Sequence, residues 1–267
     1  LSVHGPMARN IPDLALFLDT MAGFCPHDPL TYDAPTVSYS QAVAEARPPK
    51  RVAWSSNYGG KLAVDRETRD ICAAAVREFE AMGCIVEEAH PDLGDLEEAF
   101  MVLRSQHFVV DRLLQMETHR AQLKPDIVWN TEQGLQATPA RIAWAERERA
   151  AFYRRCAAFF DTYDVLVTPS AATPAFAVEL RNPEKVDGQK LTNYMGASML
   201  NAAMTLASAA AVAAPAGFDQ YGRPVGLQIA APTRGEVKAL GAAALFEQAM
   251  GLDRMLPIDP RPGTVPP

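Results

Sequence analysis

The sequence predicts a mixed α/β protein with a sheet covered by helices on both faces. A strand pattern at Arg51–Trp54 is followed by helical spacing over Asp65–Met82 and a second strand pattern at Cys84–Glu88. A strand–helix–strand unit of this length predicts two neighbouring parallel strands. Three further apolar runs are short enough for buried strands: Val165–Thr168, Ala209–Ala214 and Val225–Ala230.

Apolar residues recur with helical spacing in four other segments. The first of these segments, near residue 12, has a proline in its first turn and ends before Gly23. The last, near residue 240, ends before Gly251. The four segments are Pro12–Ala22, Asp95–His119, Thr138–Tyr163 and Glu236–Met250. A proline-rich tail, Pro257–Pro267, is expected to be irregular. No linker or internal repeat divides the chain, so we expect residues 1–267 to form one unit.

Composition and charge narrow the class of protein. The chain has 267 residues, of which 48% are hydrophobic and 21% charged, so a packed core is expected and disorder is excluded. It carries 25 Lys and Arg against 32 Asp and Glu, a formal net charge of -7, with no acidic tail. This balance is evidence against nucleic acid or an anionic membrane as the main partner.

Metal binding and cellular location can be judged from motifs that the sequence lacks. The four cysteines lie far apart in the sequence, with no C-x-x-C pair, and we expect them to be reduced and mostly buried. We therefore predict no metal site. The apolar stretch Met195–Ala216 is alanine-rich and includes Asn201, so a membrane span is not expected there. No export signal is visible at Leu1, and a cytoplasmic enzyme is the expectation.

Local motifs for catalysis are missing from the sequence. It has no G-x-S-x-G elbow, phosphate-binding loop, dinucleotide fingerprint or H-E-x-x-H motif, and its five histidines are scattered. Ser55 and Ser56 with Lys61, or Ser170 after Thr168-Pro, are the only arrangements that suggest nucleophile chemistry. Each is better interpreted as a hydroxyl in a turn or at a strand end. We assign no catalytic residue within the chain.

Three segments, in their order along the chain, carry a family resemblance. They are Gly5-Pro-Met-Ala-Arg9, then Tyr163-Asp-Val-Leu-Val-Thr-Pro169, then Pro215-Ala-Gly-Phe-Asp219 with Gly222-Arg-Pro-Val-Gly-Leu-Gln228. Their order and spacing resemble the C-terminal half of the amidase signature family, whose fold is the α/β arrangement expected above. The resemblance covers nearly the whole chain.

The resemblance implies an enzyme that hydrolyses a small carboxylic amide or transfers ammonia. Members of the family use a serine nucleophile, a second serine that relays its proton and a neutral lysine, and they need no metal or organic cofactor. In the family these residues precede a turn like Gly5–Arg9, and this chain begins at that turn. We therefore expect the Ser-Ser-Lys residues to lie upstream of this chain and the chain alone to be inactive.

Matched motifs at strand ends suggest where substrate would lie. We expect Thr168, Pro169, Thr205, Ser208 and Gly217 to face the substrate cleft and to shape it without transferring protons. Where the family has Asn-x-x-Gly-x-Pro, this chain has Thr205-Leu-Ala-Ser208-Ala-Ala210. Small residues in this segment suggest a roomier or more apolar pocket.

Two other interpretations remain open. The chain could be a non-catalytic module that pairs with a separate half or with itself as a homo-oligomer. It could also be a subunit of a tRNA-dependent amidotransferase, although the acidic charge and the altered Thr205–Ala210 segment favour a small-amide hydrolase. If an N-terminal half is missing, Val165–Thr168 and Ala209–Ala214 should be left uncovered when the chain stands alone.

Overall fold

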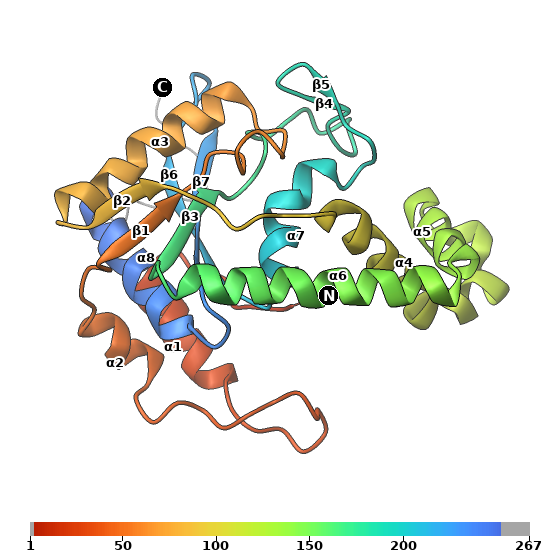
Figure 1. Ribbon diagram of the computed structural model, residues 1–267, viewed down its shortest axis with the longest axis horizontal. Helices are drawn as coiled ribbons and strands as arrows, with labels where there is room; N and C mark the ends of the chain where they lie inside the picture. Colours follow the sequence, from red (N-terminus) through yellow and green to blue (C-terminus); the bar gives the residue numbers. More distant parts are fainter. Residues whose placement is uncertain (1–2, 252–267) are drawn as a thin grey trace, which may run out of the picture.

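A computed structural model describes residues 3–251, and it confirms a mixed α/β fold with helices on both faces of a sheet (Figure 1). The five strands are in the order β2-β1-β3-β7-β6. They are β1 (Arg51–Trp54), β2 (Ile85–Glu88), β3 (Val165–Pro169), β6 (Ala210–Phe218) and β7 (Pro224–Ala231).

The predicted strand–helix–strand unit is confirmed. Strand β1 is parallel to β2 and β3, with Val52 opposite Val86 on one side and Val165 on the other. Helix α3 (Arg66–Ala81) makes the crossover between β1 and β2. The Asp65 side chain caps its first turn, accepting a hydrogen bond from the Glu67 backbone N–H at 3.1 Å. Strand β7 then runs antiparallel to both β3 and β6.

Each face of the sheet is buried under its own group of helices (Figure 1). Residues of α1 (Ile11–Met21), α2 (Tyr39–Ala44), α3 and α8 (Glu236–Met250) form a buried cluster with one face. On the other face the cluster comes from α4 (Leu96–Thr118), α6 (Pro139–Phe160) and α7 (Met199–Leu206). Helix α5 (Pro125–Gln136) packs on α4, to one side of the sheet.

The sequence patterns missed several short elements. They are α2, α5 and α7, the hairpin β4 (Lys185–Val186) with β5 (Gln189–Lys190), and single turns of 3₁₀ helix at Arg120–Gln122 and Gly196–Ser198. Helix α7 was missed because six of its eight residues are buried, so its sequence is apolar on nearly every side and shows no amphipathic spacing.

Strands β3 and β6 differ from the expectation that both would be uncovered. All five residues of β3 are buried, because β3 lies in the middle of the sheet and helices cover both of its faces. Strand β6, expected to be a buried strand, forms an edge of the sheet, and its residues from Ala211 to Ala216 alternate between exposed and buried. The prediction of an uncovered strand was wrong for β3 and right for one face of β6.

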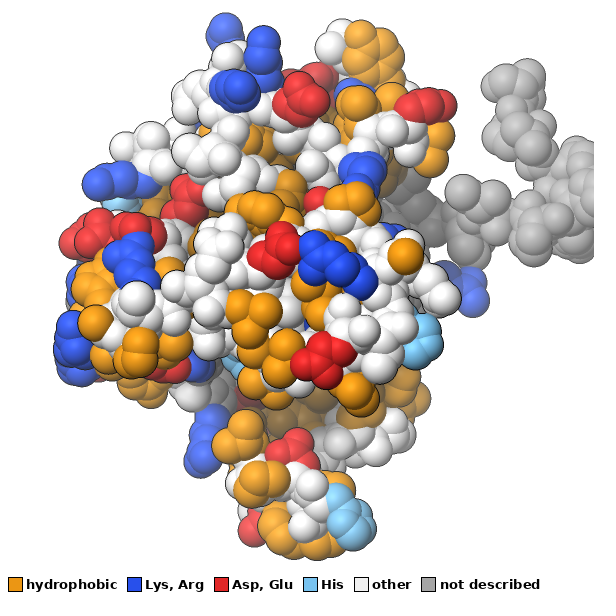
Figure 2. All heavy atoms as spheres, turned by 90° about the vertical axis from the view of Figure 1, so that its right-hand side faces the viewer, with side chains coloured by type: hydrophobic (Ala, Val, Ile, Leu, Met, Phe, Trp, Pro, Cys, Tyr) orange, Lys and Arg blue, Asp and Glu red, His pale blue; other side chains and the backbone are white. Residues whose placement is uncertain are grey.

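The cysteines are as expected, with Cys72, Cys84 and Cys156 buried, Cys25 exposed and all four free. Within residues 3–251, no helix is both long and apolar enough to cross a membrane. The predicted irregular tail, Pro257–Pro267, lies outside the described residues. At the end of the molecule that α4 and α5 form, acidic, basic and hydrophobic side chains are interspersed (Figure 2).

Candidate active-site wall

Thr168 and Pro169 lie at the end of β3, where both are buried. The Thr168 hydroxyl donates to the Pro169 carbonyl oxygen at 3.2 Å and accepts a hydrogen bond from Gln228 Nε2 at 3.2 Å. The same Gln228 amide nitrogen reaches the Leu200 carbonyl oxygen at 3.4 Å. Gln228 therefore connects β3, β7 and α7 through one buried side chain, and a buried amide left without partners would be costly.

Thr205 and Ser208 lie at the far end of α7 from this contact. Asn201 and Thr205 are four residues apart and share one side of the helix, and the Thr205 hydroxyl donates to the Asn201 carbonyl oxygen at 3.1 Å. Asn201 and Ser208 are exposed, and Ser208 has a φ of +51° in the turn that leads into β6. The exposed side of α7 is therefore a stripe of uncharged polar residues.

Gly217 lies at the other end of β6. It follows the bulge after Pro215, has a φ of +145°, and a side chain there would meet Ile71 of α3 at 3.2 Å. The seven steps from Ala210 to Gly217 span about 23 Å in an extended strand. The structure thus brings Thr168 and Pro169 together, and Thr205 and Ser208 together, but it does not gather all five predicted residues at one point.

Strand β6 presents an open face next to α7. Ala211, Ala213 and Pro215 are exposed, and they pair with Ala230, Gln228 and Gly226 of β7. Directly opposed residues in an antiparallel pair point to the same face, so these three lie on the α7 side of the sheet. The side chain next to Ala213 is the Gln228 amide that reaches α7.

The α7 stripe and the open face of β6 lie on the same side of the sheet and carry no charge, and we call them together the β6–α7 wall. It consists of Asn201, Thr205, Ser208, Ala211, Ala213 and Pro215. Sequence reasoning missed Asn201, Gln228 and Ala213. A usable signal existed for the first two, since Asn201 precedes Thr205 by one helical turn and Gln228 ends the Gly222–Gln228 motif.

A hollow of about 540 Å³ runs beside β6. Its walls are the segment Val3–Asn10, the α1 side chains Leu14 and Leu18, strand β6 and part of α8. The segment is anchored where the buried Glu247 carboxylate of α8 accepts a hydrogen bond from the Ile11 backbone N–H at 3.0 Å. A family motif, Gly5–Arg9, thereby lies along the same strand as the β6–α7 wall.

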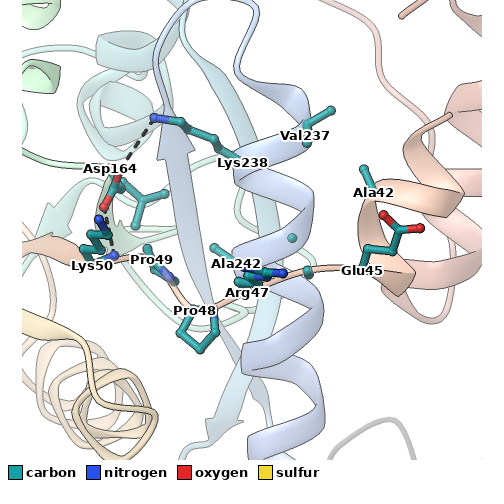
Figure 3. Close-up of a pocket in the computed structure, with 13 residues that line it drawn as sticks. Ala42, Glu45, Arg47, Pro48, Pro49, Lys50, Asp164, Val237, Lys238 and Ala242 are labelled. Atoms are coloured by element: carbon teal, nitrogen blue, oxygen red, sulfur yellow. Dashed lines mark hydrogen bonds and ion pairs between the residues drawn. The ribbon is translucent and has the colours of Figure 1, made fainter. Parts of the chain in front are cut away.

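A second hollow, of about 530 Å³, lies at the opposite end of β3 (Figure 3). Asp164 precedes β3 there and accepts hydrogen bonds from the Lys50 and Arg51 backbone N–H groups at 2.9 and 3.1 Å, with Lys238 Nζ at 3.6 Å. Ligands of open α/β sheets bind at the carboxyl ends of parallel strands. This hollow is at the amino end of β3, so we treat Asp164 as a structural group.

Replacing Asp164 by asparagine should lower the free energy of unfolding at neutral pH. The expected loss is only about 1 kcal/mol, because the carboxylate is partly exposed and its charge is screened by solvent. Burial opposes ionisation of Asp164, but the hydrogen bonds from Arg51 and Lys50 and the charge of Lys238 outweigh it and lower its pKa. The stabilisation is therefore present above the unfolded pKa and lost as the pH falls through the folded pKa.

Urea unfolding at pH 7 and again at about pH 3 would measure this difference, which should shrink at the lower pH. The exposed Asp161→Asn serves as the control. A difference between Asp164→Asn and wild type that stays constant over this range would contradict the account.

The fold is that of an α/β protein of the kind that the sequence motifs suggested, and comparison with known proteins shows its family. Residues 1–240 match the family model described as Amidase, so the chain belongs to the amidase family. It is 32% identical over 246 residues to an acylamidase of Rhodococcus erythropolis, covering 91% of this chain and 51% of that protein.

Two further comparisons agree with this assignment. A glutamyl-tRNA(Gln) amidotransferase subunit of Lysinibacillus sphaericus (strain C3-41) is 26% identical, over 95% of this chain and 55% of the relative. A solved structure of a bacterial aryl acylamidase of the amidase signature family superposes with a TM-score of 0.82 at 23% identity, covering 93% of this chain and 53% of that one. The chain spans about half the length of these relatives.

Proposed function

We propose that the protein is an amidase that hydrolyses the C–N bond of a small, uncharged carboxylic amide. Membership of the amidase family supports the reaction class, and the likeness to an acylamidase supports an acyl amide as substrate. The observation that supports an uncharged substrate is the β6–α7 wall, whose six residues include no charged side chain. A charged amide placed against such a wall would lose its hydration without gaining a partner.

The proposed chemistry is acyl transfer through a Ser-Ser-Lys arrangement. A serine hydroxyl attacks the amide carbonyl carbon, its proton passes through the second serine to the neutral lysine, and backbone N–H groups hold the oxyanion. The C–N bond then breaks as that proton is returned to the departing amine nitrogen, and water hydrolyses the acyl-serine ester to the carboxylic acid and the free serine. We propose that these residues belong to a part of the enzyme outside this chain, and that residues 1–267 alone are inactive. In support, Ser55 uses its buried hydroxyl in a turn, where it accepts a hydrogen bond from the Tyr58 backbone N–H at 2.9 Å.

A cytoplasmic location belongs to the same proposal. The three buried free thiols, Cys72, Cys84 and Cys156, suit a reducing compartment. Burial raises the pKa of the Cys72 and Cys156 thiols to about 12, so these thiols stay protonated and unreactive near neutral pH.

The reaction class is tested by assaying the natural full-length protein with uncharged acyl anilides and with amides that carry a carboxylate. We expect hydrolysis of the anilides, with kcat/KM at least about 100-fold higher than for the carboxylate-bearing amides, a ratio equivalent to about 2.7 kcal/mol. No hydrolysis of either class would overturn the proposal. Hydrolysis by residues 1–267 alone would overturn the placement of the catalytic residues outside this chain.

Changing the charge of the β6–α7 wall should change selectivity. We expect Ala213→Asp to lower kcat/KM for an uncharged anilide at least about tenfold, and to favour an amide that carries an ammonium group. Ala150→Asp, on the exposed side of α6, is the matched control and should leave kcat/KM for both substrates unchanged. Equal effects of the two variants on both substrates would argue that the wall does not face substrate.

A second candidate is the transamidation of aminoacyl-tRNA. The amidotransferase subunits that the chain resembles are 24–26% identical over 92–95% of it. An assay with misacylated tRNA and an ammonia donor separates this function from hydrolysis. The higher identity to the acylamidase and the uncharged wall favour the hydrolase.

A further inference from the structure

One face of α6 is exposed along the length of the helix, which has 22 residues and lies along the near side of the molecule in Figure 1. Ala143, Ala150 and Ala157 run along the centre of this face with a seven-residue spacing. Arg147 and Arg154 lie beside the alanines with the same spacing. Side chains as small as alanine let a second helix approach toward the lower end of the range of about 8–10 Å between helix axes.

The two arginines on this face have no acidic neighbour in their own helix. Residues three and four positions apart are neighbours on a helix surface. For Arg154 these neighbours are all alanines, and for Arg147 they are alanines and Trp144. The ion pairs that α6 makes within residues 3–251 involve other arginines, Arg141 and Arg155. The pattern therefore differs from that of an ordinary solvated helix, in which arginines pair with acids one turn away.

The exposed face is complementary to a second copy of itself. In an antiparallel pair of α6 helices with a two-fold axis at Ala150, residues equally far from Ala150 in the two directions lie opposite each other. Arg154 of one copy then lies opposite the exposed Glu146 of the other. Arg147 lies opposite Tyr153, whose ring is 40% exposed and can accept a guanidinium group on its face. Both arginines thus gain a partner that their own chain does not supply.

We propose that α6 forms the interface of a symmetric homodimer, in which the α6 helices of two copies of the protein pack antiparallel through this face. The partner is a second copy, because the reversed sequence of the same helix supplies the matching charge and ring. A parallel pair would instead place each arginine against itself, and like charges would repel. The proposal rests on the exposure and charge pattern of α6 and does not depend on amide hydrolysis.

Cysteine crosslinking of the natural full-length protein, with the exposed Cys25 replaced by serine, tests the arrangement. With a short bismaleimide, Ala150→Cys should crosslink two copies through residue 150, because the two-fold axis places this residue against itself. Ala143→Cys alone should not, since its two copies would be separated by about 21 Å along the helix pair. A mixture of Ala143→Cys and Ala157→Cys proteins should crosslink. Equal yields from Ala150→Cys and Ala143→Cys, or none from Ala150→Cys, would overturn the proposal.

Reversing charges gives a second test, measured by sedimentation equilibrium of the natural protein. Arg154→Glu should raise the dissociation constant of the dimer at least about tenfold, because the substitution acts twice across the two-fold axis and replaces attraction by repulsion. Adding Glu146→Arg should restore association. Arg77→Glu, on the exposed side of α3, is the matched control and should leave the constant unchanged. A protein that is monomeric at every concentration, or a double variant that associates no better than Arg154→Glu, would overturn the proposal.

The same axis predicts the behaviour of Ala150→Asp. This substitution places two carboxylates against each other, so the variant should sediment as a monomer, while its kcat/KM stays unchanged because Ala150 is not part of the β6–α7 wall. A variant that remains dimeric would contradict the proposed axis. Association and crosslinking are measured without substrate, so failure of the proposed amidase function would leave these results interpretable.

Discussion

Phe246→Ala is expected to lower the free energy of unfolding by about 3–5 kcal/mol. Phe246 on α8 and Phe79 on α3 are both fully buried, and their rings stack with centroids 5.5 Å apart and planes 8° from parallel. This pair lies in the core between the sheet and these two helices, where the truncation would leave a cavity that a packed neighbourhood fills only in part. Urea unfolding followed by circular dichroism measures the loss.

Phe176→Ala provides the comparison, because Phe176 is 45% exposed and its truncation opens no internal space. Its expected cost is below about 1 kcal/mol. If Phe246→Ala cost no more than Phe176→Ala, the α3–α8 contact would not be part of the core, and the layer arrangement on this face of the sheet would be in doubt.

Local signals explain why the β1–α3–β2 unit could be predicted within one or two residues. The apolar spacing of α3, the Asp65 cap and Gly83 with a φ of +87° are all short-range features. The parallel pairing follows from the crossover. Residues within this one stretch of chain therefore specify the whole unit.

The order of the other strands depends on contacts that are far apart in the sequence. Thr168 pairs with Gln228 across 60 residues, and no local pattern indicates that β7 separates β3 from β6. An alanine-rich strand such as β6 tolerates both burial and exposure, so its composition does not indicate whether it lies at the centre or the edge. Strand order was therefore the part of the fold that sequence could not provide.

The candidate site was predicted in part for the same reason. Motif positions identified Thr168 and Thr205, but the side chain that connects β3 to α7 is Gln228. Gln228 can make this connection only because β7 lies between β3 and β6, and the sequence does not indicate that strand order. Ala213 was missed because nothing in its own sequence context marks it. It matters only because strand pairing places this small, exposed residue beside the Gln228 amide. The assignment of the five predicted residues to substrate binding stays a prediction.

Gly134→Ala is expected to destabilise the contact between α4 and α5 by about 2–3 kcal/mol. An added Cβ at Gly134 would lie 2.4 Å from the Ser105 carbonyl oxygen and 2.5 Å from Val109 Cγ2, so backbone atoms of α4 would have to move. Helix propensity alone predicts the opposite sign, since alanine stabilises a helix interior over glycine by about 1 kcal/mol. The sign of the result therefore decides between close packing and propensity.

Gly241→Ala in α8 is the matched control, because its added Cβ would meet only the Ala46 side chain, at 3.3 Å. We expect a change within about 1 kcal/mol for this variant. For Gly134→Ala, hydrogen exchange should also show faster opening of α5 than of α3, since α5 packs on α4 and not on the sheet. A neutral or stabilising Gly134→Ala would mean that α4 and α5 approach less closely than the Ser105 contact requires, and that this helical pair can shift without disturbing the sheet.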